Sequence, residues 1–218
     1  MNLGLSLGLS QPGVIGSAAS TLDDLVALLS GNSSVVDFTT ATTGPFASTD
    51  LSGLANPWDT PAAGTAPGVS GTLGVTASGG TENVDYGYTS GTNTTIIYSA
   101  IYDPATTTQF VFSFNGASIL IRAQSGSVSA LPVAAGTVSV NDTVVTTRGE
   151  FFTEAMTNSE VVVKMTGLNT TATTLNLGRT STSWDGSVRR CVVIDESSVT
   201  GGDLTSARSL AEAWVAES

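Results

Sequence analysis

Apolar residues gather in short runs bounded by turn signals through the second half of the chain, and these runs predict β-strands. Residues 94–102 form one such run. In 109–114 a phenylalanine stands at every second position, so these rings share one face of a strand. Asn115-Gly116 follows and predicts a two-residue hairpin turn into a strand at 117–122, because both turn residues tolerate positive φ. Further strands are predicted at 35–38, 72–75, 127–133, 137–145, 150–155, 161–165, 174–177 and 187–194.

Helical spacing of apolar residues appears near the start of the chain. Ser20 or Thr21 can cap a short helix, and Asp23 and Asp24 suit its positive N-terminal end. Gly31 predicts its end. The apolar residues of this helix are Leu22, Leu25, Val26 and Leu29.

A second helix is predicted at the end of the chain. Thr205 or Ser206 can cap it. We expect it to close the domain by lying against a sheet. The residues that would face the sheet are Leu204, Ala207, Leu210, Ala211 and Trp214.

The first residues repeat a tetrapeptide, Leu-Gly-Leu-Ser, and place a leucine at every second position: Leu3, Leu5, Leu7 and Leu9. No charged residue precedes Asp23. Two interpretations stay open, a disordered tail and an extended arm that adds to another subunit or packs along its own domain. The arm is favoured, because alternating leucines are costly to leave in water.

Composition supports an all-β domain. The 218 residues fit one β-sandwich with extensions. Only 11% of the residues are charged, against roughly 25% in an average globular protein. Serine, threonine and 24 glycines fill that gap; threonine favours strands, and glycine and serine favour turns. The chain is therefore expected to be an antiparallel sandwich with an N-terminal extended arm, a short N-terminal helix and a C-terminal closing helix.

Missing residue types exclude many active sites. The chain has no histidine, which excludes histidine acid–base catalysis, Ser-His and Cys-His pairs and histidine metal sites. Cys191 is the only cysteine, so no intrachain disulfide or thiolate cluster forms, and its apolar neighbours favour a buried role. No phosphate-binding loop accompanies Lys164, the only lysine. We expect no cofactor.

The carboxylates do not indicate a hydrolase. Retaining glycoside hydrolysis needs two carboxyl groups about 5–5.5 Å apart. Adjacent Asp195 and Glu196 would point to opposite faces of a strand, and Glu150 and Glu154 would lie too far apart along one. The remaining acids are scattered, which disfavours a calcium loop. The protein is expected not to be an enzyme.

The net charge is −11 and is unevenly distributed. Residues 1–121 carry eight acids and no base (−8), and residues 122–218 carry ten acids and seven bases (−3). Such a surface repels phosphate backbones and anionic lipid headgroups, so binding to nucleic acid or to a membrane is not expected. No apolar run is long enough to span a bilayer, and synthesis in the cytosol is expected.

Residues 174–214 carry an ordered series of motifs. The segment Leu-Asn-Leu-Gly-Arg at 175–179 is followed by Trp-Asp-Gly at 184–186, by an apolar strand and by a helix. This series resembles the end of concanavalin A-like (laminin-G/pentraxin-like) jelly rolls. The resemblance implies an antiparallel jelly-roll sandwich over 31–218.

The resemblance assigns roles to particular residues. Gly178 and Gly186 would permit tight turns, and Trp184 would pack at the sheet edge. Arg208 stands where such helices often carry an acid. A fold resemblance transfers no ligand.

Low charge, abundant Ser, Thr and Gly, and an extended arm are together similar to the capsid decoration, cement and fibre proteins of tailed bacteriophages. This implies a structural protein on the virion surface that decorates or cements the capsid exterior. Residues 1–30 would form the assembly arm and helix, with Leu22, Leu25 and Leu29 joining the arm leucines at the interface. The partners would be the major capsid protein or other virion subunits, and a homotrimer is the expectation by analogy.

A tail- or fibre-associated carbohydrate-binding module is the alternative. The irregular segment 31–92, interrupted by prolines, contains Trp58 and two tyrosines that could stack on sugar rings. The candidate glycan contacts are Trp58, Tyr86, Tyr88 and Trp184. For Trp58, packing at the edge of the core is favoured over this role.

Overall fold

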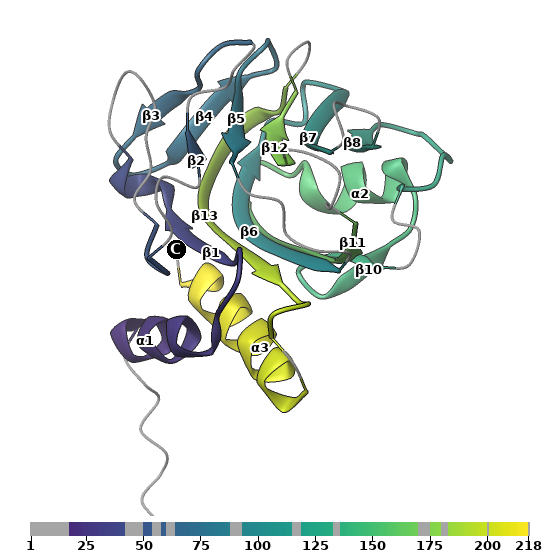
Figure 1. Cartoon of the computed structure of the whole chain (residues 1–218). Helices are drawn as coiled ribbons and strands as arrows, with labels where there is room; N and C mark the ends of the chain where they lie inside the picture. Colours follow the sequence, from purple (N-terminus) through teal and green to yellow (C-terminus); the bar gives the residue numbers. More distant parts are fainter. Residues whose placement is uncertain are drawn as a thin grey trace, which may run out of the picture.

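The strands form two antiparallel sheets packed face to face, which confirms the predicted β-sandwich (Figure 1). Every pair of strands within the two sheets is antiparallel. None of the helices in the described part of the chain is long and apolar enough to cross a membrane. The computed structural model describes residues 18–41, 50–53, 58–59, 64–87, 93–114, 119–132, 136–169, 175–179, 183–199 and 201–217.

Sheet A is the larger sheet and contains the longest strands, and sheet B covers one of its faces. The order in sheet A is β10 (Thr143–Val145), β9 (Val138–Val140), β11 (Glu160–Leu168), β6 (Thr94–Tyr102), β13 (Asp185–Asp195), β4 (Gly74–Ser78) and β3 (Gly68–Ser70), with β1 (Ser34–Asp37) also paired to β13; the order in sheet B is β2 (Trp58–Asp59), β5 (Asn83–Tyr86), β12 (Leu175–Gly178), β7 (Thr108–Phe114) and β8 (Ile119–Gln124).

The central strands of sheet A, β6 and β13, are buried on both faces. In β13, Cys191 and Val193 belong to the core between the two sheets, whereas Val192 and Ile194 belong to a second cluster on the opposite face. β6 is divided in the same way, since Ile97 faces the second cluster and its neighbours face the first. Successive side chains of a strand point to opposite faces, so both faces of these strands need an apolar cover.

The second face is covered by α3 (Gly202–Ala216) and α1 (Ala18–Leu28), which pack against each other (Figure 1). Ala207, Ala211 and Trp214 of α3 are buried in the second cluster, which confirms the predicted closing helix and its face. The helix begins at Gly202, before the predicted caps. No side-chain hydrogen bond caps this end.

Arg190 of β13 fastens the C-terminal end of α3 to sheet A. Its Nη1 donates a hydrogen bond of 2.6 Å to the backbone carbonyl of Trp214, and its guanidinium lies 4.7 Å from the centroid of that indole. Its Nε also pairs with Asp37 of β1 at 3.3 Å. A cation is favourable at a helix C-terminus, so this residue joins β13, β1 and α3.

Most predicted strands are present. The run at 94–102 coincides with β6, and the runs at 35–38, 109–114, 161–165, 174–177 and 187–194 overlap β1, β7, β11, β12 and β13. The hairpin partner predicted at 117–122 is β8, which pairs with β7 so that Phe114 lies opposite Ile119. The predicted turn at Asn115-Gly116 lies outside the described residues.

Three strand predictions were wrong in part. The run 137–145 is a hairpin of β9 and β10, because Asn141 and Asp142 adopt positive φ of 44° and 66° and turn the chain. The described residues 127–132 contain no strand, only an isolated bridge from Ala130 to Thr147. At 72–75 a turn precedes β4, which begins at Gly74.

The strand predicted at 150–155 is instead a helix, α2 (Arg148–Ala155). Thr147 and Glu150 form a capping box, in which the Thr147 hydroxyl accepts from the Glu150 amide at 3.1 Å and the Glu150 carboxylate accepts from the Thr147 amide at 3.1 Å. This reciprocal bonding satisfies two amides that a helix start leaves free. The Phe-Phe pair in the segment favoured a strand, but the capping box determined the fold.

Gly178 and Gly186 have positive φ of 84° and 135°, and both lie in strands rather than in tight turns. A Cβ on Gly186 would lie 2.0 Å from the carbonyl oxygen of Ile101, and a Cβ on Gly178 would lie 2.8 Å from the Trp184 ring. Trp184 is fully buried in the main core and not at a sheet edge. The two glycines therefore permit close packing around β13.

We expect Thr147→Ala to lower the free energy of unfolding by about 0.5–2 kcal/mol, because the start of α2 loses its cap. Chemical denaturation measures this difference. Thr107→Ala, at an exposed threonine outside α2, is the control and should change stability little. Equal effects of the two substitutions would contradict the role of the capping box.

Stability should also depend on pH through Glu150. Hydrogen bonds from the backbone and hydroxyl of Thr146 and from the backbone of Thr147 hold the pKa of this carboxyl below its ordinary value of 4.5. The ionised group therefore stabilises the fold above pH 4.5, and this contribution is lost as the pH falls through the lower folded-state pKa. The difference in unfolding free energy between the wild type and Glu150→Gln should shrink below pH 4.5, and a constant difference would contradict the prediction. Glu154→Gln, on the same helix, is the control.

Candidate functional site

The helix of the predicted assembly arm is present as α1, and it belongs to the folded body. It begins at Ala18, ahead of the predicted caps, and Gly31 adopts a positive φ of 63° just after its end. The four leucines of the predicted arm, Leu3, Leu5, Leu7 and Leu9, lie outside the described residues.

The leucines of α1 face the chain's own α3. Leu25 is fully buried in the second cluster together with Ala211 and Trp214, and Leu22 and Leu29 pack against the same cluster while remaining partly exposed. Because Leu25 is buried within its own chain, it cannot contact a neighbouring subunit. α1 therefore anchors the preceding segment to the domain.

The chain that leaves α1 is also tied to the end of β13. The Ser30 hydroxyl donates to the carbonyl of Ser198 at 2.7 Å, and the Ser33 hydroxyl accepts from the amide of Asp195 at 3.0 Å. The Asp195 carboxylate accepts from the hydroxyl of Ser198 at 3.1 Å. These bonds fix α1 at both its face and its C-terminal end.

The aromatic rings predicted to bind glycans lie in the core. Trp58, Tyr86 and Trp184 are fully buried, and the Trp58 ring packs 4.9 Å from Tyr86 and 5.8 Å from Phe38, measured between centroids. Their faces contact protein, so none of the three offers a surface on which a sugar could stack. Tyr88 lies outside the described residues.

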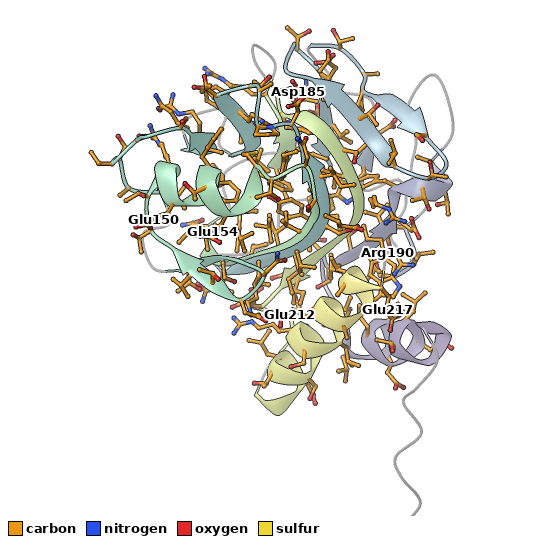
Figure 2. The ribbon with its side chains drawn as sticks, turned by 180° about the vertical axis from the view of Figure 1, so that it is seen from behind. Glu150, Glu154, Asp185, Arg190, Glu212 and Glu217 are labelled. Carbon is orange, nitrogen blue, oxygen red and sulfur yellow. The ribbon has the colours of Figure 1, made fainter. Side chains whose placement is uncertain are left out.

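Among the carboxylates in the described part of the chain, Asp59 of β2 lies directly opposite Asp85 of β5, and Asp85 accepts a hydrogen bond from the Asn176 side-chain amide. Of the acids labelled in Figure 2, Glu150 and Glu154 lie on α2, Asp185 lies at the start of β13, Glu212 lies on α3 and Glu217 directly follows α3. Within that part, no group of three or more Cys, Asp or Glu side chains is placed to hold a metal ion.

Cys191 is not a candidate nucleophile. It is buried in the main core beside Tyr98 and Tyr102, and burial raises the pKa of its thiol. The nucleophilic form of cysteine is the thiolate, which this environment disfavours. The predicted role of Cys191 as a small buried hydrophobe is confirmed.

Four of the seven basic residues form ion pairs with carboxylates. Lys164 pairs with Glu212 at 2.5 Å, and Arg189 pairs with Glu160 at 3.0 Å. Arg190 pairs with Asp37, as described above. Arg208 pairs with Glu196, which directly follows β13. The jelly-roll resemblance expected an acid at position 208 of the helix, and the arginine found there has its acidic partner outside the helix.

The other three basic residues lie together in a cluster that the sequence analysis missed. Arg122 of β8 and Arg179, which follows β12, both lie over the ring of Phe110 in β7, with guanidinium carbons 5.4 and 5.2 Å from its centroid. Burial, and then the charges of Arg148 and Arg179, lower the pKa of the Arg122 guanidinium. We call Phe110, Arg122, Arg148 and Arg179 the arginine patch.

The topology of sheet B explains how the patch forms. β12, β7 and β8 are neighbours in sheet B, and the register places Phe110 opposite Arg122. Ile121 and Ala123 face the main core, so Arg122 faces outward. Phe110 is only 5% exposed but belongs to neither hydrophobic cluster, because the two arginines cover its ring.

Arg148 enters the patch from α2, where it is the first helical residue. Its amide donates to the carbonyl of Ser129 at 2.9 Å, and the Gly149 amide donates to the carbonyl of Ser127 at 2.9 Å. Between these two serines lies Val128, whose exposed fraction of 90% is the largest among the large hydrophobic residues described. An exposed apolar side chain thus stands beside the start of α2.

Comparison with known proteins found no family model, no curated protein and no solved structure that matches this chain.

We expect Leu25→Ala to lower the free energy of unfolding by about 2–5 kcal/mol, because it leaves a cavity between α1 and α3. Asp24→Ala, on the exposed side of the same helix, is the matched control and should have a small effect. Urea denaturation measures both values. A small effect of Leu25→Ala would show that α1 is not held on α3.

Proposed function

We propose that this protein is a non-enzymatic structural protein of a phage virion surface, which decorates or cements the capsid exterior through its N-terminal segment. The body would be a jelly-roll sandwich of the concanavalin A-like type, with the major capsid protein or other virion subunits as partners. The observation that carries the proposal is the packing of α1 on α3, because it fixes the point at which the leucine-repeat segment joins the body.

The chemistry of the segment supports attachment to another subunit. Residues 1–17 contain no charged residue and carry a leucine at every second position from Leu3 to Leu9. Complete burial of a leucine side chain is more favourable than its exposure to water by a free energy of about 1.5–3 kcal/mol. A neighbouring subunit that accepts this row as an added strand would bury the leucines and satisfy the backbone.

The burial of Leu25 limits the residues that can be proposed for attachment to a neighbouring subunit. Leu25 is already buried within the chain, so the proposal assigns attachment to residues 1–17 and anchoring to α1. The alternative of a carbohydrate-binding module on a tail or fibre would need contacts other than Trp58, Tyr86 and Trp184, which are buried.

The proposal predicts that the mass in solution depends on residues 1–17. The full chain should form an oligomer, with a trimer favoured by analogy, and a chain of residues 18–218 should be a folded monomer. Light scattering gives the masses and circular dichroism the folding. Truncation after residue 30 is unsuitable, because the loss of α1 would expose the apolar face of α3.

A full-length variant in which Leu3, Leu5, Leu7 and Leu9 are replaced by serine is the matched control and should also be monomeric. Two results would contradict assembly through this segment: an oligomer that survives the truncation, or a full chain that is already a monomer.

A further inference from the structure

The arginine patch is unusual for a protein of net charge −11. All eighteen Asp and Glu residues lie in the described part of the chain, and none of them forms an ion pair there with Arg122, Arg148 or Arg179. Every other basic residue has such a partner. The chain thus holds enough carboxylates to neutralise the patch and uses them elsewhere.

The placement of the three arginines works against stability. Like charges that lie close together repel each other, and Arg148 stands at the N-terminal end of α2, where the helix dipole favours an anion. Each of these effects would be relieved by an anion bound from outside. Contact with the Phe110 ring holds Arg122 and Arg179 in place before any ligand arrives, and a guanidinium group can bind a carboxylate through two N–H groups.

We propose that the arginine patch binds carboxylate groups of an acidic segment on a partner protein, with Val128 as the apolar contact beside it. The mixture of arginines, a buried aromatic ring and an exposed aliphatic side chain is typical of the centre of a protein–protein interface.

Charge selects this ligand over a long polyanion. Glu150 and Glu154 lie on α2, the helix that begins at the patch, and the rest of the surface is strongly acidic (Figure 2). A nucleic acid would carry further phosphates across these carboxylates and be repelled. A free small anion would make no favourable contact with the exposed side chain of Val128. A short acidic segment that contains an apolar residue avoids this repulsion and can also contact Val128.

This inference goes beyond the proposed attachment through residues 1–17 and does not depend on it. The patch is formed by β7, β8, β12 and α2, all outside that segment. Binding at the patch should therefore persist in a chain of residues 18–218, whatever the mass measurement shows.

The test is titration of the full chain against a fluorescent capped peptide with two glutamates on each side of a leucine, followed by anisotropy. The wild type should bind saturably, and a peptide with glutamine in place of glutamate should not bind. Arg148→Gln should weaken binding about fivefold, the upper range for one exposed charge pair, and Arg148→Glu should abolish it. Val128→Ser should also weaken it.

Arg189→Gln is the matched control, because it changes the net charge equally at an arginine that is paired with Glu160. It should leave peptide binding unchanged. Arg148→Gln should melt at or above the wild-type temperature, since it removes repulsion, and this result separates lost binding from lost folding.

Three results would overturn the proposal. The first is an absence of saturable binding to the acidic peptide. The second is equal weakening by Arg148→Gln and Arg189→Gln, which would reflect net charge alone. The third is tighter binding of inorganic phosphate or of a twelve-nucleotide single-stranded DNA than of the peptide, which would assign the patch to a small anion or a nucleic acid.

Discussion

The constraint on which the structure depends is that the central strands of sheet A are apolar on both faces. Sheet B can cover only one face, so Val192 and Ile194 of β13 and Ile97 of β6 require a second cover. α3 provides most of it and α1 completes it. Arg190 then fixes the end of α3 by a hydrogen bond to Trp214 and an ion pair to Asp37. The two helices are therefore part of the core and not additions to a finished sandwich.

This arrangement separates anchoring from attachment at the N-terminus. Leu25 is buried within its own domain, so it holds α1 in place and cannot contact a neighbouring subunit. External contacts are therefore left to the segment that precedes α1. The bonds from Ser30 and Ser33 to the end of β13 make the junction firm. A fixed junction lowers the entropy that a binding segment loses when it docks, because fewer orientations are open to it beforehand.

Local patterns in the sequence predicted those elements whose signals agree with one another. β6 is a continuous apolar run and was predicted with its bounds, and the buried face of α3 was predicted from helical spacing. α2 was missed because Phe151 and Phe152 suggest a strand, whereas the capping box of Thr147 and Glu150 favours a helix. Core packing of Trp58 was the favoured interpretation and is confirmed, whereas the burial of Tyr86 was not predicted. The arginine patch joins residues of β7 and β8 with Arg179, which follows β12, and Arg148 of α2, so it depends on the strand order of sheet B and on the packing of α2 against β8.

Charge is scarce in this chain, so the use of each charged residue carries information. Four basic residues form ion pairs with carboxylates, and the pair between Arg190 and Asp37 joins elements far apart in the sequence. Fold stability alone would favour a similar partner for Arg122, Arg148 and Arg179, or their replacement by uncharged residues. Arg122 and Arg179 over Phe110, with Arg148 at the start of α2, instead form a cationic cluster without an ion-paired acid on an acidic protein. Positions that break a local rule are expected at functional or strained sites, and for this reason we propose the arginine patch, and not the neutralised basic residues, as a binding site.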